Sequence, residues 1–88
     1  MYTIIPHKRV LKFLQKHPDI ARQFIEKAEI MQNNPFDERL DIKQLEKDFY
    51  RLRIGDYRFL YMIENQQLKI FIVDGWSRWD IYKKLNNR

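Results

Sequence analysis

FYRLRIGDYRFLYMI, residues 49–63, places a run of aromatic, aliphatic and arginine residues on each side of Gly55-Asp56. Glycine at the first position of a two-residue loop suits a type II′ turn, so this stretch predicts a β-hairpin. The predicted register sets Arg53 directly opposite Arg58.

Side chains alternate across a strand, so the two faces of this hairpin differ in character. One face carries three arginines, Arg51, Arg53 and Arg58. The other carries Tyr50, Leu52, Ile54, Tyr57, Phe59, Tyr61 and Ile63, which is enough apolar surface to build a core. The hairpin therefore predicts a sheet with a packed face and an arginine face.

The arginine face suggests that the protein binds an anion there. Like charges placed opposite each other on a sheet are unfavourable by about 0.2–1 kcal/mol per pair. Phosphate is the natural candidate, because the guanidinium fork matches its geometry. The alternative is that three solvated arginines simply occupy the exposed face of an antiparallel sheet.

Length and composition limit the possible classes of protein. The 88 residues predict a single domain, 1–88, too small for two lobes around a cleft. There is no cysteine, which excludes disulfides and thiolate metal sites. No apolar run approaches the roughly 20 residues of a bilayer span, and the N-terminus lacks a secretion signal. We expect a cytoplasmic protein with no membrane partner.

The positive charge is concentrated in the half of the chain that contains the hairpin. The formal net charge is +5. Residues 1–42 hold seven basic and six acidic side chains, whereas residues 43–88 hold ten and six. Such a distribution is what a nucleic-acid-binding surface would produce, although many basic proteins bind no nucleic acid.

The remaining elements follow from periodicity. Residues 2–5 predict a strand ended by Pro6, and two apolar patterns predict helices over 7–16 and 20–32, the second with Asp19 as its N-cap. Residues 41–45 are either a short strand or the approach to the hairpin. Residues 68–73 predict a central strand ended by Asp74-Gly75. The expected fold is α+β, in the order β-α-α-β-β-β, with a helical hairpin on one face of a small antiparallel sheet and a short C-terminal segment.

Several kinds of active site are missing from the sequence. There is no cysteine nucleophile, no recognisable Ser-His-Asp spacing, no phosphate-binding glycine loop and no metal-ligand cluster, so we expect no cofactor and no metal. A two-histidine ribonuclease built on His7 and His17 is conceivable. We favour instead that both are surface histidines flanking a helix.

What remains is a set of arginines and aromatics: Arg51, Arg53, Arg58, Arg78 and Tyr82. Such a set could bind a polyanion, stabilise a pentavalent phosphorane and stack on a base. Attack by an RNA 2′-hydroxyl on the adjacent phosphate needs no protein nucleophile. It does need a proton acceptor, and arginine is a poor one.

Candidate proton-transfer and RNA-contact groups lie near the C-terminus. Tyr82 is the best donor and acceptor of the set, and Lys83 or Lys84 could assist. Trp76 and Trp79 either stack on bases or pack at the sheet edge, and we favour packing for at least one. The predicted RNA contacts beyond the arginines are Lys69, Trp79, Lys83 and Lys84.

The whole pattern resembles the RelE/ParE superfamily of type II toxins. FYRLRIGDYRFLY matches the family's basic-x-basic strand, short turn and Tyr-Arg-x-x-Tyr, and GWSRWDIY resembles its closing Gly-(His or Lys)-Arg-x-x-x-Tyr with one extra residue after Gly75. The resemblance covers nearly the whole chain. It implies a RelE-like fold and a cognate antitoxin partner.

The resemblance also assigns roles to individual residues. Arg51 and Arg53 fall where RelE-type nucleases hold two basic residues near the scissile phosphate, and Arg58 where an arginine stabilises the transition state. Arg78 matches the arginine of the last motif, and Tyr82 the tyrosine that stacks on the substrate base. Such enzymes cut mRNA in the ribosomal A site without metal.

Two departures from the pattern bear on catalysis. Ser77 stands where relatives often have His or Lys, and positions 51 and 53 are both Arg rather than Lys. Either geometry and electrostatics carry the reaction, or activity is weak. Three functions therefore remain: a ribosome-dependent mRNA endonuclease, which we favour, a ParE-type poison of DNA gyrase, and a catalytically inactive RNA-binding homologue.

Overall fold

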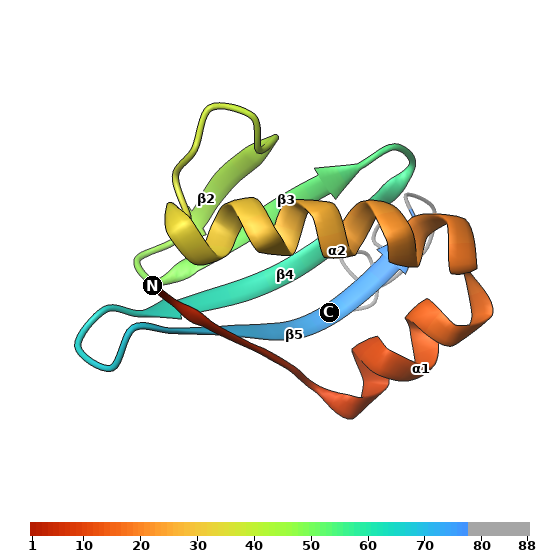
Figure 1. Cartoon of the computed structure of the whole chain (residues 1–88), viewed down its shortest axis with the longest axis horizontal. Helices are drawn as coiled ribbons and strands as arrows, with labels where there is room; N and C mark the ends of the chain where they lie inside the picture. The colour runs from red at the N-terminus through yellow and green to blue at the C-terminus, as the bar shows by residue number, and fades with distance from the viewer. Residues whose placement is uncertain (78–88) are drawn as a thin grey trace.

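The computed structural model describes residues 1–77 and forms two helices on a five-stranded sheet (Figure 1). The elements are β1 (Thr3–Pro6), α1 (Lys8–Lys16), α2 (Pro18–Asn33), β2 (Ile42–Glu46), β3 (Phe49–Ile54), β4 (Tyr57–Glu64) and β5 (Lys69–Ser77). The sheet order is β1-β5-β4-β3-β2. This is the expected α+β arrangement of a helical hairpin on one sheet face.

One feature of the sheet differs from the sequence prediction, and a second decides between two alternatives that it left open. β1 pairs with β5 in parallel, so the sheet is mixed rather than purely antiparallel. After β1, the helical hairpin carries the chain across the sheet to β2 at the opposite edge. The later strands then return to β1, and β5 runs parallel to it, which adjacent strands joined by a tight turn could not do. The second feature is β2, which is a true edge strand, whereas the sequence left residues 41–45 open.

The helical hairpin turns at His17-Pro18. α2 begins at Pro18 rather than Ile20, and the predicted cap at Asp19 is wrong, because Asp19 lies inside the first turn and bonds Arg22. Proline is well suited to the first helical position, since its missing N–H would be unpaired there. His17 ends α1 and precedes α2, and its carbonyl accepts the N–H of Ala21.

The predicted β3–β4 hairpin is confirmed residue by residue. Arg53 lies opposite Arg58, Leu52 opposite Phe59 and Ile54 opposite Tyr57. Gly55 has φ +58°, and Asp56 is not in the left-handed region, as a type II′ turn requires. The turn thus depends on glycine at position 55.

The core lies between this hairpin and α2, which crosses one face of the sheet (Figure 1). Leu52, Phe59 and Tyr61 are completely buried, and α2 contributes Phe24 and Met31 from the apolar stripe that the sequence predicted. All seven hairpin residues predicted to face the core are buried or partly buried against it. The helices therefore cover the apolar face and leave the arginine face without a helix over it, among residues 1–77.

β5 continues through Asp74-Gly75, where the sequence predicted its end. Val73 is an extra residue opposite β4, so the register shifts between Leu60 and Tyr61 without interrupting the pairing. The nearly buried Asp74 carboxylate accepts the Gly75 N–H at 2.8 Å and lies 3.5 Å from an Arg9 guanidinium nitrogen. These contacts keep the chain in β5 beyond Asp74-Gly75. As a result, Trp76 lies opposite Arg58 on β4.

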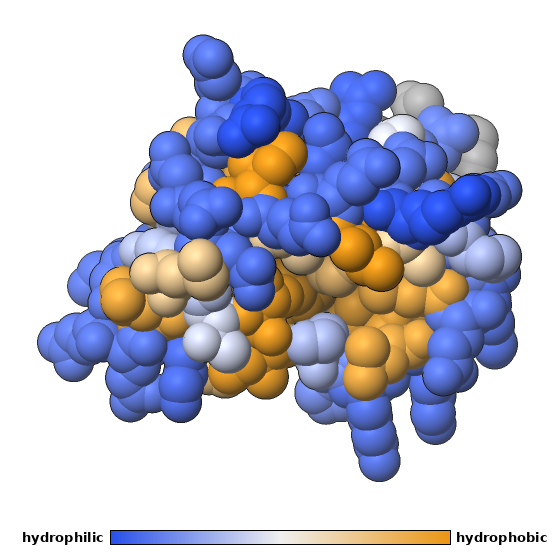
Figure 2. Space-filling model, viewed as in Figure 1, coloured by the Kyte–Doolittle hydropathy of each residue, from blue (hydrophilic) through white to orange (hydrophobic). Residues whose placement is uncertain are grey.

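Apolar surface remains on the helix side of the molecule (Figure 2). Leu11 of α1 and Ile25 of α2 stay about half exposed, at 47% and 56%. Neither helix in residues 1–77 has the length and apolar character that crossing a membrane would demand.

Candidate functional site

The arginines occupy one end of the open sheet face, and the strand register defines their layout. Arg53 pairs with Arg58, which pairs in turn with Trp76 on β5. Arg51 lies one row further along, between Lys43 of β2 and Leu60 of β4. Four positive side chains from three strands therefore share a small area, as the sequence predicted for the three arginines.

The turn carbonyl of Gly55 offsets part of the repulsion between Arg53 and Arg58. Arg58 Nη1 donates to Gly55 O at 3.0 Å, and Arg53 Nε donates to the same oxygen at 3.4 Å. Arg58 also donates to its neighbour's carbonyl, Tyr57 O, at 3.1 Å. The two guanidinium groups are thus drawn toward one point beside the turn.

Asp41 is the second source of negative charge, and sequence reasoning missed it. Its backbone carbonyl accepts the Arg53 N–H at 2.9 Å, which places it at the start of β2 beside Arg53. Its Oδ1 lies 4.0 Å from Arg51 Nη2, and its Oδ2 lies 3.8 Å from Arg53 Nε. The carboxylate therefore stands between the two arginines of β3.

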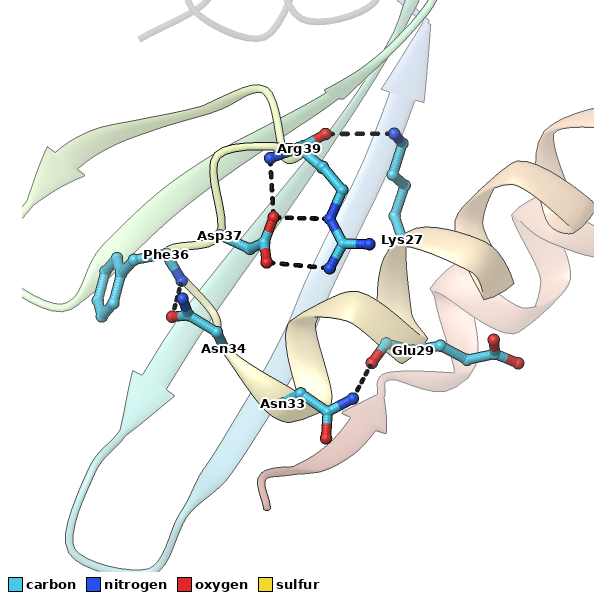
Figure 3. Close-up of polar contacts among 7 residues, drawn as sticks. All are labelled: Lys27, Glu29, Asn33, Asn34, Phe36, Asp37 and Arg39. Carbon is cyan, nitrogen blue, oxygen red and sulfur yellow. Dashed lines mark hydrogen bonds and ion pairs between the residues drawn. The ribbon is translucent and has the colours of Figure 1, made fainter.

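Polar contacts stabilise the connection from α2 to β2, the segment that precedes Asp41 (Figure 3). Asp37 binds the Arg39 guanidinium with both oxygens, at 2.9 and 3.0 Å, and Lys27 of α2 donates to Arg39 O at 3.3 Å. The hydrogen bonds from Arg39 lower the pKa of Asp37 to about 2. Leu40, next to Asp41, is buried in the core. Polar contacts at Asp37 and Arg39 and the buried side chain of Leu40 therefore hold the connection between α2 and β2.

Apolar side chains fill the middle of the open face, which the sequence did not predict. The residues in register across four strands are Phe49, Met62, Phe71 and Ile5. All four are partly exposed. The face is therefore an arginine cluster next to an apolar band rather than a uniformly polar surface.

The other predicted site residues lie away from this cluster or outside the described residues. Arg78, Trp79, Tyr82, Lys83 and Lys84 fall beyond residue 77, so their roles stay predictions. Lys69 pairs with Glu64 at the opposite end of β4, about 20 Å from Arg58 at ~3.4 Å per residue. The described structure does not bring Lys69 to the arginines.

The histidines contribute nothing to the arginine cluster. His17 packs against Phe13 on the helix side, and its Nδ1 lies 3.5 Å from the Tyr57 hydroxyl. His7 caps α1 by accepting the Arg9 N–H at 3.1 Å. Within residues 1–77 no three His, Asp or Glu side chains gather as a metal site would require.

Comparison with known proteins identifies the family. Residues 4–82 match the sequence model described as ParE toxin of type II toxin-antitoxin system, parDE. The chain belongs to the RelE/ParE superfamily of type II toxins. A chain in the archaeal RelE–RelB complex from Pyrococcus horikoshii OT3 is 35% identical, with a TM-score of 0.81 over 88% of this chain and 94% of that one. The resemblance seen in the sequence is confirmed.

Two further RelE/ParE-type structures agree on the fold. A chain in the RelB–RelE complex from Methanococcus jannaschii is 26% identical, with a TM-score of 0.72 over 91% of this toxin and 96% of that chain. The isolated E. coli RelE toxin is 19% identical, with a TM-score of 0.72 over 100% and 98%, which supports the fold alone. A search of curated protein sequences gives no match.

Proposed function

We propose that this toxin is a metal-independent endoribonuclease that cuts mRNA, with the ribosomal A site as the place of action. The observation that carries the proposal is the arginine cluster, in which Arg51, Arg53 and Arg58 share one open face beside a turn. Guanidinium groups bind phosphate oxygens in pairs and stabilise the extra charge of a phosphorane. The RNA's own 2′-hydroxyl is the nucleophile.

Each cluster residue has a part in this reaction. Arg51 and Arg53 would hold the scissile phosphate, and Arg58 would neutralise charge that develops in the transition state. Arg51 Nε is buried with no hydrogen-bond partner in residues 1–77, so a phosphate that reorients this guanidinium would relieve an unpaired donor. Arg78 would add a fourth arginine, Tyr82 would stack on a base, and Trp79, Lys83 and Lys84 would extend the RNA contacts.

An antitoxin partner is part of the proposal. The Pyrococcus and Methanococcus structures named above are complexes of RelE with RelB. We expect a cognate antitoxin to present an acidic or amphipathic segment to the arginine face, because such a segment complements its charge. Neutralisation would then follow from blocking the phosphate site.

A gyrase poison is the second candidate, because the matching family model is described as a ParE toxin. A protein that inhibits gyrase needs no cleavage site for RNA. Inhibition of supercoiling in a purified gyrase assay, without any RNA cleavage, would select this function. An inactive RNA-binding homologue would give neither activity.

The deciding experiment is primer extension on a defined mRNA, with purified toxin, in the presence and absence of programmed ribosomes. We expect position-specific cuts only where ribosomes are present. Cuts in naked RNA would retain the nuclease and make the protein's own basic face responsible for positioning. Absence of cuts in both reactions, from folded protein, would overturn the proposal.

A matched pair of variants tests the site within that assay. Arg58→Ala should abolish cleavage and growth inhibition while leaving the fold intact. Arg22→Ala serves as the control, because Arg22 is an exposed arginine on α2 that forms a surface ion pair with Asp19. Tyr82→Phe should also reduce cleavage strongly. A fully active Arg58→Ala would rule out the assigned site.

A further inference from the structure

Among residues 1–77, the side chains assigned to the proposed reaction so far include no proton acceptor. Arginine stays protonated at all relevant pH values, so Arg51, Arg53 and Arg58 cannot remove a proton from the 2′-hydroxyl. Ser77, next to Arg78 in the sequence, offers only a weakly basic hydroxyl. A group with free lone pairs, close to the phosphate-binding arginines, is required.

Asp41 meets this requirement. Its oxygens lie 4.0 and 3.8 Å from the nearest nitrogens of Arg51 and Arg53, which is beyond hydrogen-bond distance. Its side chain is 56% exposed, so substrate can reach it. In residues 1–77 the carboxylate accepts no hydrogen bond. It therefore lies beside both arginines with its lone pairs available.

The other carboxylates near this end of the sheet do not have these properties. Asp37 binds Arg39 through both oxygens at hydrogen-bond distance. Asp74 is nearly buried and is engaged by Gly75 and Arg9. Asp56 lies in the turn and forms no ion pair with a described residue. Among residues 1–77, Asp41 alone combines exposure with two arginine neighbours.

We propose that Asp41 is the general base of the RNA cleavage, an assignment that rests on the proposed endonuclease function. Asp41 takes the proton of the 2′-hydroxyl as its oxygen forms a bond to phosphorus. The bond from phosphorus to the 5′-oxygen breaks, and that oxygen takes a proton from water. The products are a 2′,3′-cyclic phosphate and a 5′-hydroxyl, and no co-reactant is consumed.

The geometry suits this order of events. A phosphate bound by Arg51 and Arg53 would lie close to Asp41, because the carboxylate is within 4.0 Å of both guanidinium groups. The backbone bond from Arg53 N to Asp41 O holds the start of β2 against β3 at the position of Arg53. Burial of Leu40 restrains the loop on the preceding side. The backbone segments that carry the base and the arginines are therefore joined directly.

A counter-ion role for Asp41 makes a different prediction, which allows a clean test. A carboxylate that only screens the arginines competes with phosphate, so its removal would tighten RNA binding without slowing cleavage. A general base contributes about 10²–10⁴-fold to a rate. Its removal would slow cleavage by that factor while binding stays equal or becomes tighter.

The experiment uses full-length Asp41→Asn in the reaction, naked RNA or programmed ribosomes, in which the wild type cuts. Single-turnover cleavage is measured beside binding to an RNA with 2′-deoxy substitution at the cut site. Asp56→Asn is the matched control, because it removes the same charge beside the same turn. Asp41→Glu should recover part of the rate, and thermal unfolding verifies the fold of each variant.

Each outcome is decisive. Cleavage lowered about 10²–10⁴-fold with binding retained, and Asp56→Asn unaffected, supports the assignment. Undiminished cleavage by Asp41→Asn, or binding lost in step with cleavage, overturns it while leaving the endonuclease function standing. A wild type that cuts no RNA in either reaction overturns both proposals together.

Discussion

The two faces of the sheet use the same strands for opposite purposes. On β3, Leu52 is completely buried under α2, whereas its neighbour Arg53 is 52% exposed beside another arginine. The packed face stabilises the fold because it removes apolar area from water. The arginine face places like charges together, which costs free energy. Stability thus depends mainly on the packed face and ligand binding on the arginine face. Substitutions on the packed face should lower stability, and substitutions on the arginine face should weaken binding.

The largest stability effect should come from the packed face. Leu52→Ala should lower the free energy of unfolding by about 2–5 kcal/mol, because it removes a fully buried side chain and leaves a cavity. Chemical denaturation measures the loss. Leu45→Ala is the control, since Leu45 on β2 is 50% exposed and should change stability by no more than about 0.5 kcal/mol. Equal effects at the two positions would contradict the assignment of the core face.

Gly75→Ala should have the next largest effect. A Cβ at Gly75 would lie 2.8 and 2.9 Å from two ring carbons of the buried Phe59, so the ring must move. Such overpacking typically costs about 1–3 kcal/mol. A thermal-unfolding series that adds Phe59→Leu tests the cause, because a smaller side chain should make the double variant's loss less than the sum of the single losses. Additive losses would point to a different origin.

The sequence predicted the packed face better than the arginine face, for physical reasons. Gly55-Asp56 sets the hairpin register by local turn chemistry, so the positions of Leu52 and Arg53 followed from two residues. Asp41 did not follow. It reaches the arginines only through β2, whose residues show no apolar alternation and include a register shift between Gln44 and Glu46.

Long-range pairing explains the other differences. β1 joins β5 in parallel across more than sixty residues, and no local pattern encodes that pairing. The continuation of β5 past Asp74-Gly75 depends on the extra residue Val73 and on the Arg9 contact with Asp74. Residues that signal a turn by themselves were thus retained in a strand by tertiary contacts.

Tyr61→Phe, also on the packed face, should raise stability rather than lower it. The Tyr61 hydroxyl is buried with no hydrogen-bond partner in residues 1–77, and burial raises the pKa of Tyr61. Removing an unpaired buried hydroxyl should stabilise the fold by up to about 1 kcal/mol. Tyr2→Phe is the control, because it deletes a hydroxyl that donates to Asn65 at 2.8 Å and should not stabilise. A destabilised Tyr61→Phe would reveal a partner for this hydroxyl.

The smallest stability effect, and the sharpest functional one, should come from Arg53→Gln. Removing one member of the Arg53–Arg58 pair relieves repulsion but loses a weak bond to the turn carbonyl and an exposed ion pair with Asp41. Stability should therefore change by no more than about 0.5 kcal/mol. RNA binding should weaken for every sequence, and the slope of log affinity against log salt should fall by about one, as one phosphate contact is lost. Arg22→Gln removes the same charge from α2 and should leave that slope unchanged. An equal change of slope in both variants would mean that net charge, rather than the arginine face, attracts the RNA.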